Sequence, residues 1–302
     1  MDQKPKIIVI LGQTATGKSD FAVEIARVIG GEIISADSRQ VYRGMDLGTG
    51  KITKREMQKI PHYLLDVVSP KKVFSVSDFK KHSEKAINKI LKNKHTPIIC
   101  GGTGFYIDAV IDGTLLPEVP PNKKLRAELA KKSAEQLFIM LTKLDPKRAK
   151  TIDVNNPVRL IRAIEIAKTL GAVPSGRPMS GKYEVLKIGL MLPDEVLKEK
   201  IRTRLLARIK KGMLREIKKL HDEGISWKRL EALGLEYRYC ALHLQGKLSK
   251  QEMTEKLSTE IWHYAKRQKT WFKRDKETFW IDPREIHQKA KALKKVKEFL
   301  KD

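Results

Sequence analysis

The first hundred residues alternate between short apolar runs and longer stretches in which apolar residues recur at helical spacing. Residues 7–11 (IIVIL) form an unbroken aliphatic run, which is typical of a strand buried on both faces. From Phe21 to Ile29 the apolar residues follow the spacing of one helix face. Further strand-like runs cover residues 31–36, 62–68 and 97–100. Strands that alternate with helices predict an α/β fold with a parallel sheet flanked by helices.

This pattern stops at a proline-rich segment, residues 117–121 (PEVPP). Residues 122–171 have a helical pattern throughout, and residues 172–183 are rich in Gly, Pro and Ser, which predicts an irregular return segment. A strand-like run at 187–192 then resumes the sheet. We therefore expect two domains. Residues 115–185 would form an all-helical insertion, and residues 1–114 with 186–302 an α/β core that ends in a basic helical part.

The first strand leads directly into Gly12-Gln13-Thr14-Ala15-Thr16-Gly17-Lys18-Ser19, which fits G-x-x-x-x-G-K-[ST] at every fixed position. A strand before this motif and a helix after it are the context that a phosphate-binding loop (P-loop) requires. Backbone N–H groups and the helix N-terminus favour phosphate oxygens, Lys18 adds a charge, and the Ser19 hydroxyl can bind Mg²⁺. The sequence therefore predicts a site for a di- or triphosphate, as in ATP-binding proteins, with Mg²⁺ as cofactor.

Asp37 follows the second predicted strand, beside the P-loop in a parallel sheet. An acid at this position can hold Mg²⁺, act as a general base, or cap its turn through Ser38. The fourth predicted strand ends in Gly101 rather than in the acid that would hold a metal in an ATPase. That difference argues against ATP hydrolysis and favours a catalytic role for Asp37.

The net charge and the number of cysteines limit the partners and the kinds of site that we expect in this protein. Lys and Arg number 62 against 36 Asp and Glu, so the formal net charge is +26. This excess predicts a polyanionic partner such as nucleic acid, although solvated lysine-rich helix faces fit the composition equally well. Cys100 and Cys240 are too few for a disulfide framework or a metal cluster, and Cys100 ends an apolar run as a core residue. The apolar run near the N-terminus is too short for a signal peptide or a membrane span, so we expect a cytoplasmic protein.

Five segments in chain order resemble the signature blocks of the tRNA dimethylallyltransferases. They are GQTATGKS (12–19), SADSRQVYRGMDLGTGK (35–51), GGTGFYIDAVIDG (101–113), NPVRLIRAIE (156–165) and YAKRQKTWF (264–272). This family transfers a dimethylallyl group from its diphosphate to N6 of the adenosine 3′ of the anticodon. The resemblance implies dimethylallyl diphosphate and the tRNA anticodon stem-loop as substrates, and we expect a monomer.

The chain departs from the family pattern in three places. Residues 48–52 (GTGKI) stand where GTAKP is common, and residues 234–238 (GLEYR) differ from the usual block, which leaves the tRNA contacts there open. The zinc-finger extension of eukaryotic members has no counterpart.

The resemblance assigns roles to the candidate residues. Lys18 and Mg²⁺ on Ser19 would neutralise the departing diphosphate, and the Thr14 hydroxyl would reach its bridging oxygen. Asp37 would take the proton from N6 as general base. Arg204 is a candidate second clamp on the diphosphate, its alternative being a solvated helix arginine.

The target base must leave its stack to reach such a site. The resemblance places tRNA contacts at the Asp37 turn, at Thr103 and Arg126 beside the tRNA-side mouth, and on one segment of the insertion. These residues are Asp37, Ser38, Arg39, Gln40, Thr103, Arg126, Val158, Arg159, Leu160, Ile161 and Arg162. Near the C-terminus, Trp271 and Phe272 fall on the apolar face of a helix, so we expect them to pack in the core rather than to stack on bases.

Three other functions fit parts of the sequence. An adenylate isopentenyltransferase would prenylate free AMP, ADP or ATP, but it needs neither the insertion nor the basic C-terminal third. A small-molecule kinase would transfer phosphate from ATP. An RNA-binding NTPase would hydrolyse nucleotide in response to RNA without prenyl transfer.

Overall fold

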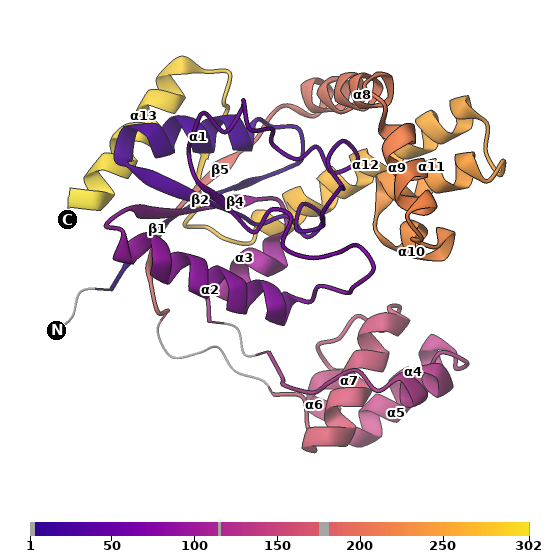
Figure 1. Ribbon diagram of the computed structural model, residues 1–302. Coiled ribbons are helices and arrows are strands. Elements are labelled where there is room, and N and C mark those ends of the chain that lie inside the picture. The colour runs from indigo at the N-terminus through magenta and orange to yellow at the C-terminus, as the bar shows by residue number, and fades with distance from the viewer. Residues whose placement is uncertain (1–3, 114–115, 175–180, 302) are drawn as a thin grey trace. The chain divides into compact units, whose positions relative to one another are not determined.

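The computed structural model describes residues 4–113, 116–174 and 181–301 (Figure 1). The chain forms two compact units, one of residues 1–111 with 181–302 and the other of residues 112–180. We expected the insertion to cover residues 115–185. Glu184 and Val185 instead pair with Lys6 and Ile7 in the sheet of the larger unit.

The larger unit is built on a parallel sheet, which confirms the predicted α/β class. In the described part of the chain the strand order is β3-β2-β4-β1-β5-β6. The strands are β1 (Lys6–Gly12), β2 (Gly31–Ser35), β3 (His62–Tyr63), β4 (Thr96–Gly101), β5 (Glu184–Leu190) and β6 (Phe279–Ile281). Since β2, β4 and β1 are neighbours, the loops after their carboxyl ends meet at one edge of the sheet.

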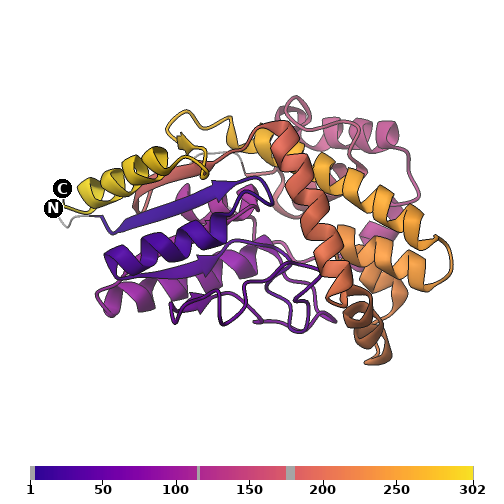
Figure 2. The same ribbon diagram turned by 90° about the horizontal axis from the view of Figure 1, so that it is seen from above.

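Helices cover both faces of this sheet because its central strand is apolar on both sides. Ile8 and Ile10 pack with α1 (Lys18–Ile29) and α13 (Ile286–Lys301), the indigo and yellow helices of Figure 2. Ile7 and Val9 pack on the other face with α2 (Val76–Lys92) and α3 (Gly104–Ile111). The unbroken apolar run in the sequence reflects this two-sided burial.

Two strands differ from the prediction. The expected strand 62–68 pairs only at His62 and Tyr63, because Leu64 and Asp66 adopt positive φ angles of 62° and 56° that turn the chain away. Val68 forms an isolated bridge with Tyr42. Strand β6 was not predicted, since only three residues, 279–281, extend the edge of the sheet beside β5.

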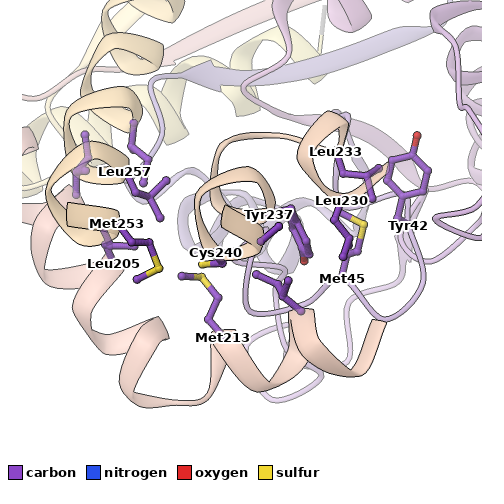
Figure 3. Packing of buried hydrophobic residues seen from close by; sticks show 14 of the residues in the cluster. Tyr42, Met45, Leu205, Met213, Leu230, Leu233, Tyr237, Cys240, Met253 and Leu257 are labelled. Carbon is purple, nitrogen blue, oxygen red and sulfur yellow. The ribbon is translucent and has the colours of Figure 1, made fainter. Parts of the chain in front are cut away.

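The helices after β5 have a hydrophobic core of their own. They are α8 (Asp194–Lys210), α9 (Met213–Asp222), α10 (Trp227–Ala232), α11 (Leu235–Leu244) and α12 (Lys250–Phe272). Tyr237, Cys240 and Met253 are buried at the centre of this core (Figure 3). Helix α12 continues out of it, packs against β1, and buries Phe272 in the core of the sheet. One helix therefore connects the helical cluster to the P-loop edge of the sheet.

The smaller unit contains α4 (Lys123–Leu129), α5 (Ala134–Leu144), α6 (Pro146–Ala149) and α7 (Pro157–Leu170). Leu137, Leu141 and Leu160 are fully buried between them. The helical pattern of residues 122–171 is thus confirmed. Part of the expected return segment, residues 175–180, lies outside the described residues. In the ranges that the structure covers, we found no helix both long and apolar enough for a membrane span.

Candidate active site

The P-loop lies between β1 and α1 and carries the unusual backbone that its motif demands. Gly17 at the N-cap of α1 has φ 89°, and Ala15 has φ 64°, a conformation that costs a non-glycine residue free energy. No side chain caps the N-terminus of α1. Its first N–H groups are therefore left for an anion, which is the arrangement that binds phosphate.

A cavity of about 470 Å³ opens beside this loop. The P-loop, the turn after β2, the end of β4, and helices α8 and α12 supply its lining. The predicted residues that line it are Thr14, Ala15, Gly17, Lys18, Ser19, Asp37, Gln40 and Arg204. Gly12, Gln13 and Thr16, the other predicted P-loop residues, are buried and are not among the residues that line the cavity. The fold thus brings the proposed phosphate side and the proposed base into one cavity.

Two cations, Lys18 and Arg204, line the cavity and have shifted pKa values. Burial, with a smaller contribution from the charge of Arg204, lowers the pKa of Lys18 to about 8. The Lys18 ammonium donates a hydrogen bond to the backbone carbonyl of Gln13. Arg204 is partly accessible to solvent. The protein around its guanidinium and the charge of Arg208 nevertheless lower the pKa of Arg204 as well. These cations destabilise one another, so an anion bound between them would be stabilised by both.

The Asp37 carboxylate both caps its own turn and lines the cavity. Its Oδ1 accepts hydrogen bonds from the N–H groups of Arg39 (2.8 Å) and Gln40 (3.3 Å). The turn is held from outside by Thr103, whose Oγ1 accepts from the N–H of Ser38 at 3.1 Å. The cap predicted through Ser38 therefore runs through the next two residues, and it fixes the direction of the carboxylate.

Sequence reasoning missed two cavity residues on α12, Tyr264 and Gln268. The Tyr264 hydroxyl is hydrogen-bonded to Thr103, and burial together with the charge of Asp37 raises its pKa. Gln268 is 5% exposed and bonds to both Thr14 and Gly102. A glutamine on the apolar face of YAKRQKTWF was the signal that could have identified it. Other unpredicted lining residues include Asp20, Glu56, His62, Glu199, Lys200 and Thr203.

Trp271 is partly buried beside the sheet and donates from Nε1 to Asp108, while Phe272 is buried, as expected for core packing. Cys100 lines the cavity wall, and burial raises its pKa to about 12, so it is no thiolate nucleophile.

The predicted tRNA contacts of the insertion lie in the smaller unit and have different surroundings. Arg126 and Arg162 both bind the carboxylate of Glu165, which is 1% exposed. Val158 and Arg159 are exposed at the start of α7, and Ile161 is partly buried. Leu160 is fully buried in the helical core, so in this structure its side chain is not presented to RNA.

Comparisons with known proteins agree with this geometry. Residues 40–275 match the sequence model of the IPP transferase family. A tRNA dimethylallyltransferase of Treponema denticola is 45% identical over 279 residues, which cover 91% of this chain and 93% of that protein. One of Geotalea daltonii is 43% identical over 268 residues, 89% of this chain and 86% of that protein.

Solved structures are similar over the same length. The full-length tRNA isopentenylpyrophosphate transferase of Bacillus halodurans has a TM-score of 0.75 at 34% identity, covering 99% of this chain and 97% of that one. A eukaryotic dimethylallyltransferase acting on tRNA has a TM-score of 0.75 at 25% identity, covering 89% and 70%. Matches of this extent, together with a P-loop cavity of this composition, establish that the chain belongs to the IPP transferase family.

Proposed function

We propose that this protein transfers a dimethylallyl group from dimethylallyl diphosphate to N6 of the adenosine 3′ of the anticodon in tRNA. One observation carries the proposal: a single cavity contains mutually repelling cations, Lys18 and Arg204, and a fixed carboxylate, Asp37. The reaction needs both, since a diphosphate leaves as an anion while an amine loses a proton.

The cations serve the leaving group. As the bond between the allylic carbon and the diphosphate oxygen breaks, negative charge develops on that oxygen. Lys18, Arg204 and the open N-terminus of α1 stabilise this charge, and Thr14 lines the same region. Because these groups are already in place, their stabilisation of the transition state costs little reorganisation.

Mg²⁺ fits this site through Ser19, a hydroxyl-bearing residue that lines the cavity next to Lys18 in the chain. Among the described residues, no group of three or more His, Cys, Asp or Glu could hold a metal ion. Ser19 and the oxygens of the substrate diphosphate would therefore hold the ion, which would supply further neutralisation of the leaving group.

Asp37 serves the acceptor. The lone pair of an adenine exocyclic amine is delocalised into the ring, so N6 is a weak nucleophile. As the N6–carbon bond forms, the N6 proton passes to the Asp37 carboxylate, whose direction is set by the N–H groups of Arg39 and Gln40. Tyr264 and Thr103 enclose the same side.

The tRNA would be bound at the Asp37 turn of the cavity and by residues of the smaller unit. The target base would be flipped into it, past the turn of Asp37, Ser38, Arg39 and Gln40 and past Thr103. The exposed residues Val158 and Arg159, with Arg126 and Arg162 oriented by Glu165, would contact the anticodon stem-loop. The net charge of +26 suits such a partner. We further propose that the protein acts as a monomer in the cytoplasm.

The family match favours tRNA over a free adenine nucleotide as acceptor. Residues 40–275 include the whole smaller unit, 112–180, which an enzyme acting on AMP would not need.

Asp37→Asn tests the base directly. The amide oxygen can still accept the two N–H groups that the carboxylate caps, but the side chain can no longer accept a proton. Dimethylallyl diphosphate and unmodified tRNA are incubated with enzyme, and prenylated adenosine is quantified by mass analysis of nucleosides. We expect kcat to fall about 10²–10⁴-fold while the binding of both substrates is retained. Near-normal turnover would remove Asp37 as the base.

A further inference from the structure

Gln268 occupies an unusual place for a polar side chain. It lies on the buried face of α12, between Ala265 and Phe272, and is 5% exposed. Its Oε1 accepts a hydrogen bond from the backbone N–H of Thr14 at 2.8 Å, and its Nε2 donates one to the backbone carbonyl of Gly102 at 2.8 Å. A buried amide is costly unless both ends are bonded, and here both are.

The two backbone groups belong to the loops that follow two neighbouring strands, β1 and β4. Thr14 is in the P-loop, on the side proposed for diphosphate. Gly102 begins the turn that carries Thr103, and Thr103 holds the Asp37 turn through the N–H of Ser38. One side chain therefore joins the P-loop to the turn that holds the Asp37 turn. These partners lie 254 and 166 residues away in the sequence.

The surrounding packing permits little adjustment. A Cβ on Gly102 would lie 2.2 Å from Nε2 of Gln268, so the turn can approach α12 this closely only without a side chain. A second link from the same helix acts nearby, since Nε2 of Gln13 donates to the carbonyl of Ala265 at 3.2 Å. Helix α12 is in turn anchored in the helical cluster through Met253 and Leu257.

We propose that Gln268 is a positioning residue that sets the separation between the P-loop and the Asp37–Thr103 side of the cavity. The inference rests on the function proposed above, in which the allylic carbon must lie in line between diphosphate and N6. Displacing one reactant by about 1 Å can lower a rate about 10²-fold without weakening binding to a similar degree. Gln268 would thus act on kcat through the two backbone segments it joins, without touching substrate.

The variant Gln268→Glu tests this with a pH signature. The carboxylate can accept from the N–H of Thr14 but repels the carbonyl of Gly102. When protonated, the same side chain can accept and donate, as glutamine does. At pH 8 we expect kcat about 10²-fold below wild type, with KM for both substrates changed by about threefold or less. The ratio of variant to wild-type kcat should rise as the pH is lowered from 8 to 6, because burial favours the protonated form.

Two further variants complete the experiment. Gln268→Met removes both hydrogen bonds at similar volume, so its kcat should be about 10²-fold below wild type at every pH. Gln251→Glu is the matched control at the start of the same helix, where the exposed glutamine bonds only to Glu255 among the described hydrogen bonds, and its activity should stay within about twofold of wild type at all pH values.

A pH-independent ratio for Gln268→Glu, or losses confined to KM, would overturn the positioning role. If Gln268→Glu did not fold, Gln268→Met would decide, and a kcat within about threefold of wild type would reject the inference. Wild-type enzyme that formed no prenylated adenosine from dimethylallyl diphosphate and unmodified tRNA would instead overturn the proposed function, so the two failures are distinguishable.

Discussion

Two groups of cations in this protein have opposite electrostatics. In the cavity, burial lowers the pKa of both Lys18 and Arg204, and a neighbouring cation adds to this effect, Arg204 for Lys18 and Arg208 for Arg204. In the smaller unit, hydrogen bonds to Glu165 raise the pKa of Arg126. Burial alone would raise the pKa of Glu165, but hydrogen bonds from Arg126, the Asn122 N–H and Arg162 lower it to about 2.

This difference separates two uses of the same chemistry. Cations that repel one another beside an open helix N-terminus stabilise an anion that comes from outside. Cations that share a buried carboxylate stabilise the fold, and the carboxylate fixes the direction in which they point. We therefore expect changes in the first group to affect catalysis, and changes in the second to affect the stability of the smaller unit.

The largest effect should come from Lys18→Ala. Loss of this charge removes stabilisation of the departing diphosphate, so kcat/KM for dimethylallyl diphosphate should fall about 10²–10³-fold. Steady-state kinetics measure the loss, and far-UV circular dichroism should show an unchanged fold. A decrease of less than about tenfold would mean that the cavity cations do not act on the leaving group.

Glu165→Gln should instead destabilise the smaller unit by about 1.5 kcal/mol, because two partly exposed arginines lose a charged hydrogen-bond acceptor. All four tryptophans, residues 227, 262, 271 and 280, lie in the larger unit. Circular dichroism in a denaturant titration should therefore show an earlier transition, while that of tryptophan fluorescence stays in place. Affinity for tRNA should fall, and that for dimethylallyl diphosphate should not. Equal shifts of the circular dichroism and fluorescence transitions would contradict the distinction between the cavity cations and the cations around Glu165.

The stability of the smaller unit at low pH provides an independent test of the role of Glu165. The folded pKa of Glu165 lies below its ordinary value of 4.5, so its stabilisation is present above that value. It should be lost as the pH falls from about 4.5 towards 2, and the glutamine variant should lack this component.

The smallest expected effect is the pH dependence of the binding of dimethylallyl diphosphate. In the proposed mechanism, diphosphate binds to protonated Lys18, whose pKa burial lowers to about 8. KM for dimethylallyl diphosphate should therefore rise above pH 8, by up to about tenfold per pH unit. The matched variant Lys18→Arg keeps its charge throughout and should give a flat profile. A flat wild-type profile would show that Lys18 keeps its proton without ligand.

Local patterns were sufficient to predict the P-loop, the position of Asp37 and the helical character of residues 122–171. A buried strand, a glycine motif and an amphipathic helix are each encoded within a few turns of chain. The short strand β6 escaped prediction because three residues carry no periodicity, and β3 was overextended because backbone turns at Leu64 and Asp66 interrupt an apolar run.

The sequence by itself determined the phosphate loop, the charge and the family resemblance. Only the tertiary structure decided that Gln268 joins Thr14 to Gly102 and that Glu165 pairs with Arg126. The physical reason is that these hydrogen bonds depend on positions within a few tenths of an ångström between distant segments. Such positions are set by how α12 packs on the sheet and how α4 packs on α7, which no local spacing of residues records.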